Sequence, residues 1–242
     1  MTSDSGLPVF PVYNHRRLPD PDDNLDDGAV FLADKPSGWS SFDVVKFLRN
    51  RIRTRKIGHA GTLDPLATGL LILCTGKATK SISIFQDYAK RYKASVVFGM
   101  STPSHDAATE PDGHAPAGHL DEEKIRHVLE NRFQGKITQI PPMYSALWKD
   151  GKRLYTYARK GKVVEREPRD IEIFETRILR FEGMKLELEV LCSKGTYIRK
   201  LAYDLGLELD TLAHLSKLRR TQIGQFNVDD AMTIDQIRSL SE

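Results

Sequence analysis

The chain has 242 residues, of which 40% are hydrophobic and 29% are charged. This composition can bury a sizeable core and excludes global disorder, and the length suits one large domain or two small ones. No apolar run is longer than Leu70–Cys74, which is far short of the roughly 20 residues of a membrane-spanning helix. The N-terminus lacks the pattern of a signal peptide, so we expect a soluble, cytoplasmic protein.

The net charge of +3 is unevenly distributed along the chain. Residues 46–56, 149–169 and 217–220 together carry +14, and the remainder carries −11. Concentrated basic stretches in an otherwise acidic chain favour a surface that binds a polyanion such as nucleic acid, although a charge run is more often only a solvated helix face.

The N-terminal third alternates between strand and helix patterns. Residues 1–28 are rich in Pro, Gly and Asp and predict a mobile or loosely docked arm. A strand is expected over 29–33, followed by a turn through 34–38. Ser40 and Asp43 form a capping-box pattern, so a helix begins there and ends before Gly58. Its apolar face is predicted to consist of Phe42, Val45, Leu48 and Ile52.

The middle of the chain reads as a buried strand over 69–74, a helix near 78–85 and an alternating strand over 92–98. A long loop is expected over 101–119 and a helix over 125–133. Residues 141–169 are polar and basic with little core pattern, and loops of that length are usually functional.

The C-terminal part predicts an alternating strand, Met184–Cys192, with one buried face. The spacing of four apolar residues predicts a helix packed on a core: Ile198, Leu201, Ala202 and Leu205. Thr233 and Gln236 cap a last short helix. Cys74 and Cys192 are expected to be reduced core thiols. Strands and helices are mixed without a regular β-α-β alternation, which indicates an α+β fold.

The densest candidate for chemistry is the loop from His59 to Gly69, which contains Asp64. An Asp before Pro is most often only a turn cap. Here, however, Leu63, Leu66, Leu70 and Leu71 surround Asp64 in sequence and would hold its carboxylate in a partly dry pocket. A buried carboxylate needs a cationic partner to stay ionised. In an RNA-facing pocket it would be a nucleophile or a base.

The stretch HAGTLDPLATGLL (59–71) resembles the signature of the TruB family of tRNA pseudouridine synthases. Five further stretches are similar to the family in the same order: DKPSGWSSFDVV (34–45), KRYKASVVFG (90–99), IPPMYSALWKDGKRLY (140–155), SKGTYIRKLAYDLG (193–206) and LRRTQIGQF (218–226). Together they span most of residues 30–228.

The resemblance implies the pseudouridine synthase catalytic fold, a mixed and mostly antiparallel sheet flanked by helices with an RNA-binding cleft. It implies isomerisation of uridine 55 in the tRNA T-loop to pseudouridine, with base flipping and no cofactor or metal. It also implies that the protein is a monomer and that its partner is tRNA. No membrane and no obligatory protein partner are expected. The order of the chemical steps stays open at this point.

The resemblance also assigns residues. Asp64 is implied as the catalytic carboxylate, Arg199 as its pairing arginine and Tyr92 as the tyrosine that stacks on the target base. From periodicity alone, Arg199 would be an exposed helix residue and Tyr92 an ordinary strand aromatic. His59 is implied to stack in the space that the base leaves, and Leu218 to line the pocket. Further implied substrate-binding residues are Lys35, Tyr197, Asp106, Arg153, Arg159 and Lys160.

Residues 141–169 match the family's thumb insertion, which would contact phosphates together with 46–56 and 217–220. We therefore expect an acidic arm (1–28), a catalytic domain (29–228) and a short C-terminal tail (229–242) in place of the family's RNA-binding PUA domain. Two departures stand out. Trp148 occupies a position where a polar or basic residue is usual, and could add a stacking surface. Pro103 replaces an expected Asp in a loop where Thr102, Ser104 and Asp106 match, so the contacts made by that loop need not be those of the family.

Three alternatives remain from the sequence. A metal-dependent hydrolase is suggested only by the seven histidines, whose spacing matches no zinc motif. A non-catalytic RNA-binding or RNA-folding module would use the same basic surface, yet would not need Asp64, Tyr92 and Arg199 together. A pseudouridine synthase acting on another RNA would keep the chemistry and change the target.

Overall fold

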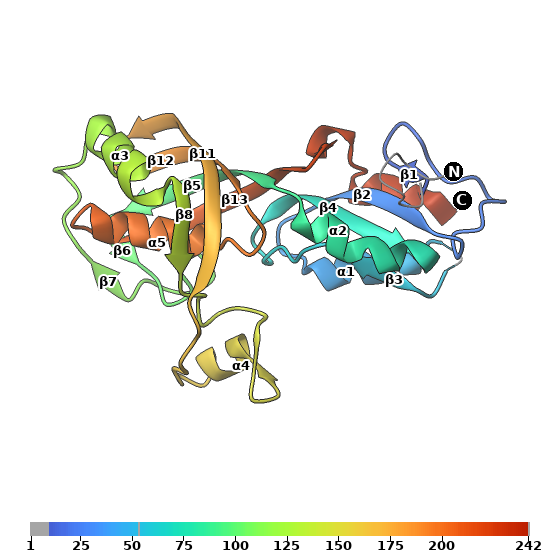
Figure 1. Cartoon of the computed structure of the whole chain (residues 1–242), viewed down its shortest axis with the longest axis horizontal. Coiled ribbons are helices and arrows are strands. Elements are labelled where there is room, and N and C mark those ends of the chain that lie inside the picture. The colour runs from blue at the N-terminus through green and yellow to red at the C-terminus, as the bar shows by residue number, and fades with distance from the viewer. Residues whose placement is uncertain (1–9, 53, 242) are drawn as a thin grey trace. The chain divides into compact units, whose positions relative to one another are not determined.

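The computed structural model describes residues 10–52 and 54–241. Expectations for residues 1–9 and for Arg53 of the basic stretch lie outside the described residues. The chain divides into two compact units, residues 1–91 with 219–242 (unit 1) and residues 92–218 (unit 2). It passes from one unit to the other within strand β5 (Lys90–Phe98) and within strand β13 (Ala213–Ile223) (Figure 1).

Unit 1 has a mixed sheet in the order β1 (Val12–Tyr13), β2 (Ala29–Lys35), β4 (Thr68–Thr75) and the C-terminal part of β13. β1 pairs with β2 in parallel, β2 with β4 antiparallel, and β4 with β13 in parallel. β3 (Ile57–His59) pairs with β4, and β14 (Phe226–Asn227) pairs with β13. The helices are α1 (Ser41–Arg49), α2 (Ile82–Asp87) and α6 (Ile234–Arg238), with 3₁₀ turns at Gly76–Ser81, Val228–Asp230 and Ser239–Ser241.

Unit 2 continues from β13 through β5, β12 (Lys185–Cys192), β11 (Arg169–Glu182) and β8 (Gly135–Gln139). β11 is antiparallel to both β12 and β8. Its helices are α5 (Ile198–Glu208) and α3 (Glu122–Val128), which continues into a π turn at Leu129–Phe133. β6 (Met100–Ser101) pairs with β7 (Gly113–His114). The thumb insertion holds the hairpin β9 (Trp148–Lys149) and β10 (Lys152–Arg153), and α4 (Leu154–Ala158).

Both faces of the sheet of unit 1 are buried. Phe31 of β2 and Leu71 of β4 belong to the cluster that also contains Val45 and Leu48 of α1. Leu32, on the opposite face of β2, packs in a second cluster. A strand buried on both faces reads as a continuous apolar run, which explains why 69–74 lacked alternation. The expected α+β fold with a mixed sheet flanked by helices is therefore confirmed.

Several local predictions are confirmed. Capping boxes are present at Ser40 with Asp43 and at Thr233 with Gln236. Burial alternates along β5 as expected. The four apolar residues of α5 that were expected to face the core are all buried. Cys74 and Cys192 are free and buried.

The predicted burial of two residues, Phe42 and Met184, is wrong. Phe42 is 60% exposed, and Val44 is buried in its place. The helix is only nine residues long, and the face that it turns to the core centres on Val44, Val45 and Leu48 rather than on its first turn. Met184 is 51% exposed because it belongs to the turn before β12, whose buried face begins at Leu186.

The described part of the N-terminal segment, residues 10–28, is not loosely docked, which corrects our expectation. Tyr13 is 2% exposed and its ring lies 5.0 Å from that of Phe31. Its hydroxyl donates to Asp23 at 2.6 Å, and burial together with that carboxylate raises the pKa of Tyr13 to about 12. Leu25 is also buried. The segment is acidic in composition, yet two of its apolar residues, Tyr13 and Leu25, pack in the core cluster that contains Phe31 of β2.

Among the described residues, no helix is long and apolar enough to cross a membrane.

Candidate active site

The loop that carries Asp64 lies between β3 and β4 in unit 1 and is held on both sides of the carboxylate. On the N-terminal side, the backbone N–H of Leu63 donates to the Ser41 hydroxyl at 2.9 Å, and this hydroxyl donates to the Leu63 carbonyl at 3.3 Å. On the C-terminal side, the Pro65 carbonyl accepts from the backbone N–H of Gly38 at 2.8 Å. Asp64 itself is half-buried. Its backbone position is therefore fixed by the start of α1 and by the preceding turn.

Lys35, the last residue of β2, is fully buried beneath this loop. Its ammonium group donates to the carbonyls of Pro36 at 2.9 Å, Trp39 at 2.6 Å and Pro65 at 3.2 Å. Burial lowers the pKa of Lys35 to about 8, whereas the negative charge of Asp64 acts in the opposite direction. Lys35 therefore supplies a positive charge that interacts with Asp64 and also ties the residue after Asp64 to the turn.

Arg220 is another buried cation of unit 1, with 1% of its surface exposed. Its guanidinium donates to the carbonyl of Leu70 at 2.8 Å and to that of Gly61 at 3.1 Å. It therefore braces the loop from the opposite side to Lys35. The expectation that residues 217–220 extend the RNA-binding surface is wrong for Arg220, because this side chain is buried and two of its guanidinium nitrogens donate to carbonyls of unit 1. Arg219 is paired as well, with Asp34 at 3.0 and 2.7 Å.

Gly69 lies between the two cationic residues in the sheet. It is the register partner of Lys35 in β2 and of Arg220 in β13. Its φ is +105°, and a Cβ atom there would lie 2.2 Å from the Arg220 carbonyl oxygen. Only glycine permits this backbone conformation and this approach of β13.

His59, at the end of β3, is half-buried and is the register partner of Leu73. Burial lowers the pKa of His59, and the charge of Arg220 lowers it further, while a backbone hydrogen bond at Gly61 has the opposite effect. A neutral imidazole is therefore favoured at neutral pH. Of the four leucines expected around Asp64, Leu66 is exposed, and the other three are buried.

Arg199 lies in the first turn of α5 in unit 2 and is 4% exposed, so the reading as an exposed helix residue is wrong. Its guanidinium lies 3.9 Å from the Asp106 carboxylate and 3.4 Å from the Ser104 carbonyl. Asp106 is itself buried. The expected pairing of Arg199 with Asp64 joins residues of different units and stays a prediction.

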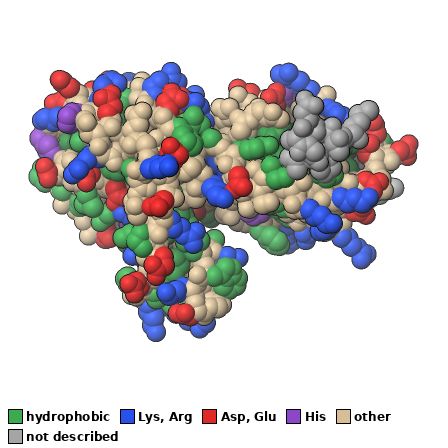
Figure 2. Space-filling model, viewed as in Figure 1, with side chains coloured by type: hydrophobic (Ala, Val, Ile, Leu, Met, Phe, Trp, Pro, Cys, Tyr) green, Lys and Arg blue, Asp and Glu red, His purple; other side chains and the backbone are tan. Residues whose placement is uncertain are grey.

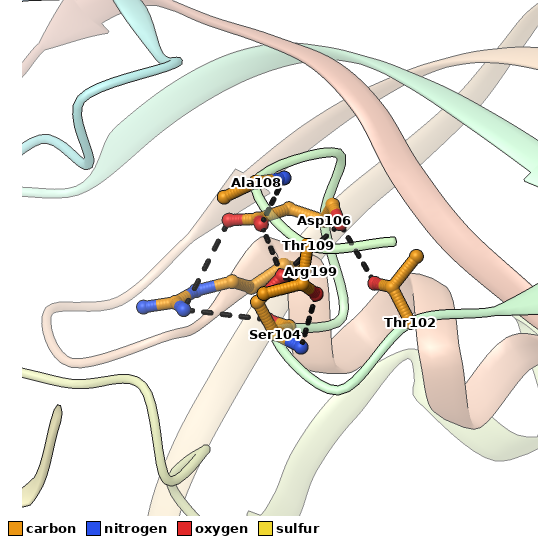
Figure 3. A network of polar contacts seen from close by, with 6 residues as sticks. All are labelled: Thr102, Ser104, Asp106, Ala108, Thr109 and Arg199. Atoms are coloured by element: carbon orange, nitrogen blue, oxygen red, sulfur yellow. Dashed lines mark hydrogen bonds and ion pairs between the residues drawn. The ribbon is translucent and has the colours of Figure 1, made fainter. Parts of the chain in front are cut away.

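The loop that presents Asp106 is braced by its own side chains (Figure 3). The Ser104 hydroxyl and the Ala108 backbone N–H donate to one carboxylate oxygen of Asp106, at 2.6 and 3.0 Å. The Thr102 hydroxyl donates to the Asp106 carbonyl at 2.7 Å. The other carboxylate oxygen faces Arg199. Pro103 at the departure from the family pattern is exposed and leaves these contacts in place.

Tyr197 precedes α5 and is held by a residue that the sequence did not single out. The Gln139 amide accepts from the Tyr197 backbone N–H at 2.9 Å and donates to its carbonyl at 3.1 Å. Gln139 is 4% exposed at the end of β8. A lone Gln before Ile-Pro-Pro carries no recognisable signal, so only the tertiary structure reveals this role. The ring of Tyr197 lies 5.8 Å from the Arg199 guanidinium.

The remaining predicted residues lie in unit 2. Tyr92, on β5, is 8% exposed, and Leu218, on β13, is half-buried. In the thumb insertion, Arg159 and Lys160 are exposed, and Arg153 is half-buried. The structure thus brings Lys35 and Asp64 together in unit 1, with His59 at the start of the same loop, and it brings Asp106, Tyr197 and Arg199 together in unit 2. Among the described residues, no three His, Cys, Asp or Glu side chains are grouped as metal ligands.

Two family models match this chain. One, described as TruB family pseudouridylate synthase (N terminal domain), matches residues 49–198. The other, described as tRNA pseudouridylate synthase B C-terminal domain, matches residues 199–242.

Individual relatives agree with the family models. The chain is 48% identical over 215 residues to "tRNA pseudouridine synthase B" of Flavobacterium johnsoniae, covering 86% of this chain and 93% of the relative. It is 46% identical to the protein of the same name from Bordetella avium, covering 88% of each. A chain in the crystal structure of a Cbf5-Nop10-Gar1 complex aligns with a TM-score of 0.65 at 31% identity. That alignment covers 85% of this chain and 53% of the other, so this chain spans about half the length of that solved chain. On the extent of the family match and of these identities, the chain belongs to the TruB family of pseudouridylate synthases.

Proposed function

We propose that this chain converts uridine 55 in the T-loop of tRNA into pseudouridine, with Asp64 as the catalytic carboxylate. The observation that carries the proposal is the fixed loop around Asp64. Hydrogen bonds hold the residues on both sides of it, and its charge interacts with the buried Lys35. Relatives at 46–48% identity are named tRNA pseudouridine synthase B, which supports tRNA as the substrate.

The proposed reaction is an isomerisation. The N1–C1′ bond of the uridine breaks, the detached base rotates, and a C5–C1′ bond forms. The proton on C5 is lost and N1 gains a proton, so atoms and electrons balance without a cofactor. Three roles for Asp64 are compatible with this sequence: attack on the sugar, addition to the base, or removal of a proton on the way to a glycal.

The other proposed residues serve binding and orientation. The target base lies inside a folded loop, so it must be flipped out at a cost of roughly a few kcal/mol. We assign Tyr92 to stacking on the flipped base, with Leu218 lining the pocket, and His59 to the space that the base leaves. Arg199 is assigned to pair with Asp64 and keep it ionised. Its contact with the Asp106 carboxylate supports this role, because that carboxylate orients the guanidinium.

The thumb insertion is proposed to bind the phosphates of the T-arm. Between residues 149 and 169 it carries eight basic and three acidic side chains. Arg153, Arg159 and Lys160 would contribute affinity without reading sequence, because phosphate contacts position the RNA and base contacts specify it.

Tritium release from tRNA labelled at C5 of uridine tests the proposal directly, because forming the C5–C1′ bond expels the C5 hydrogen. We expect one equivalent per tRNA from the wild-type chain and none from Asp64→Asn. Asp235→Asn is the matched control, since Asp235 is an exposed carboxylate of α6 and should leave release unchanged. A tRNA without the T-loop uridine should release nothing.

Other outcomes would point elsewhere. Absence of release from tRNA that is demonstrably bound would favour a non-catalytic RNA-binding module. Release from another RNA, and not from tRNA, would keep the chemistry and change the target. Release that survives Asp64→Asn would show that Asp64 is not the catalytic carboxylate.

A further inference from the structure

Trp148 is the most exposed aromatic side chain among the large hydrophobic residues of the described chain, with 63% of its surface accessible. It lies in the first strand of the β9–β10 hairpin of the thumb insertion. Its ring nevertheless has a partner, because the Arg153 guanidinium lies 4.2 Å from the ring centroid. At that distance the guanidinium covers one face of the indole.

The hairpin explains why these two side chains meet. Trp148 and Arg153 are register partners in the antiparallel pair, and directly opposite residues project from the same face. The strands are joined by Asp150 and Gly151, whose φ values of +48° and +72° fit the Asp-Gly turn that closes two-residue hairpins. The Arg153 guanidinium also donates to the Ala146 carbonyl. Arg153 is thus anchored at both ends and favours one orientation of the indole.

Basic residues are concentrated in the segment that carries this ring. Lys149, Lys152 and Arg153 belong to the same hairpin, and Arg159 and Lys160 follow α4. Figure 2 shows Lys, Arg and hydrophobic side chains, with fewer acidic ones, at the surface of the segment that carries α4; the sequence has eight basic and three acidic residues between 149 and 169. An aromatic face inside a positively charged surface is the arrangement by which proteins hold unpaired nucleotides, since every base has a π face and every nucleotide a phosphate.

We propose that the open face of Trp148 stacks on an unpaired nucleobase of the RNA, outside the base that is isomerised. The inference rests on the proposed function for the identity of the RNA. The charge of the surroundings favours RNA over an apolar protein surface, which would have to desolvate the flanking lysines. Arg153 pre-organises the ring, so little side-chain entropy is lost on binding.

Binding and fluorescence test the proposal, in an Asp64→Asn background so that the RNA is not converted. The chain has two tryptophans, Trp39 and Trp148, so the difference in quenching between the background and Trp148→Phe reports on Trp148. We expect the tRNA to quench this component, and inorganic polyphosphate, which has charge and no bases, to leave it unchanged. Trp148→Ala should weaken tRNA binding at least about fivefold, and Trp148→Phe about twofold or less.

Salt dependence separates stacking from charge. In Trp148→Ala the slope of log Kd against log salt concentration should equal that of the background. In Lys152→Ala it should decrease by about 0.7–0.9, the value for one phosphate contact. Val163→Ala is the control for the insertion, because Val163 is 78% exposed and should leave both affinity and slope unchanged.

Three results would overturn the proposal: unchanged affinity in Trp148→Ala, equal quenching of Trp148 by polyphosphate, or a changed salt slope in Trp148→Ala. Tritium release by the Asp64-containing chain decides the proposed function separately. Quenching by tRNA without any release would therefore leave the stacking site standing and remove the catalytic assignment.

Discussion

The loop that carries Asp64 and the thumb insertion are held in place by different kinds of contact. The loop is bound by segments remote in sequence, among them Ser41, Lys35 and Arg220, all of them buried. In the insertion, the hydrogen bonds join residues close in sequence, such as Leu154 to Leu147 and Tyr155 to Ser145. A catalytic group needs a position fixed by the core, whereas a segment proposed to bind phosphates can be held by its own hairpin. Substitutions in the two regions should therefore differ in kind.

The largest contrast is expected between two glycines of positive φ. Gly69→Ala should lower the free energy of unfolding by more than about 2 kcal/mol and abolish activity, because the Cβ would collide with the Arg220 carbonyl. Gly151→Ala in the hairpin should cost only about 1–2 kcal/mol, since nothing lies within 4 Å of the added Cβ and only backbone strain remains. Urea unfolding measures both. Equal losses would show that the approach of β13 does not constrain the loop.

Removing charge from the insertion should affect binding alone. The triple variant Arg153→Ala, Arg159→Ala and Lys160→Ala should raise KM roughly 10- to 100-fold at 0.1 M salt and flatten its salt dependence, with kcat unchanged. Steady-state kinetics at several salt concentrations provide the test. An unchanged KM would remove the thumb from binding, and a large fall in kcat would contradict the separation of the two regions.

Ser41→Ala should show the opposite pattern. It leaves the buried Leu63 N–H without its acceptor, which costs about 1–3 kcal/mol of stability. Because the residue before Asp64 is released, we expect kcat to fall more than KM rises. Ser37→Ala is a suitable comparison, as the Ser37 hydroxyl reaches the same loop at Leu66 from an exposed position. A rise in KM alone would mean that Ser41 does not position the carboxylate.

The smallest effect concerns the pH dependence of stability. The pKa of Lys35 in the folded chain, about 8, lies below its ordinary value of 10.5. Between those values the unfolded chain binds the proton more tightly than the folded chain does, so the contribution of Lys35 to the free energy of unfolding rises with pH. The stability of the wild type relative to Lys35→Met should therefore increase from pH 7.5 to 9.5. A difference that is constant with pH would show that burial does not shift this pKa.

Local sequence patterns predicted the elements well where each signal acts over a few residues. Such signals arise within one element. Examples are the capping boxes at Ser40 and Thr233, the alternation of buried residues in β5 and the helical spacing of apolar residues in α5. The same reasoning failed at Phe42 and Met184 because element ends depend on which turn meets the core. It also gave no sign of Gln139, whose amide partners lie 58 residues away.

The sequence by itself determined the fold class, which follows from periodicity, and the family and Asp64 as the candidate carboxylate, which follow from the resemblance of short motifs in a fixed order. Only the tertiary structure decided which charges are structural. Arg219 and Arg220 are neighbours of Lys217 in a basic run, yet Lys217 is exposed and Arg220 is buried with its donors on Leu70 and Gly61. The reason is that a charge is fixed by residue type, while its burial and partners depend on the strands brought beside it.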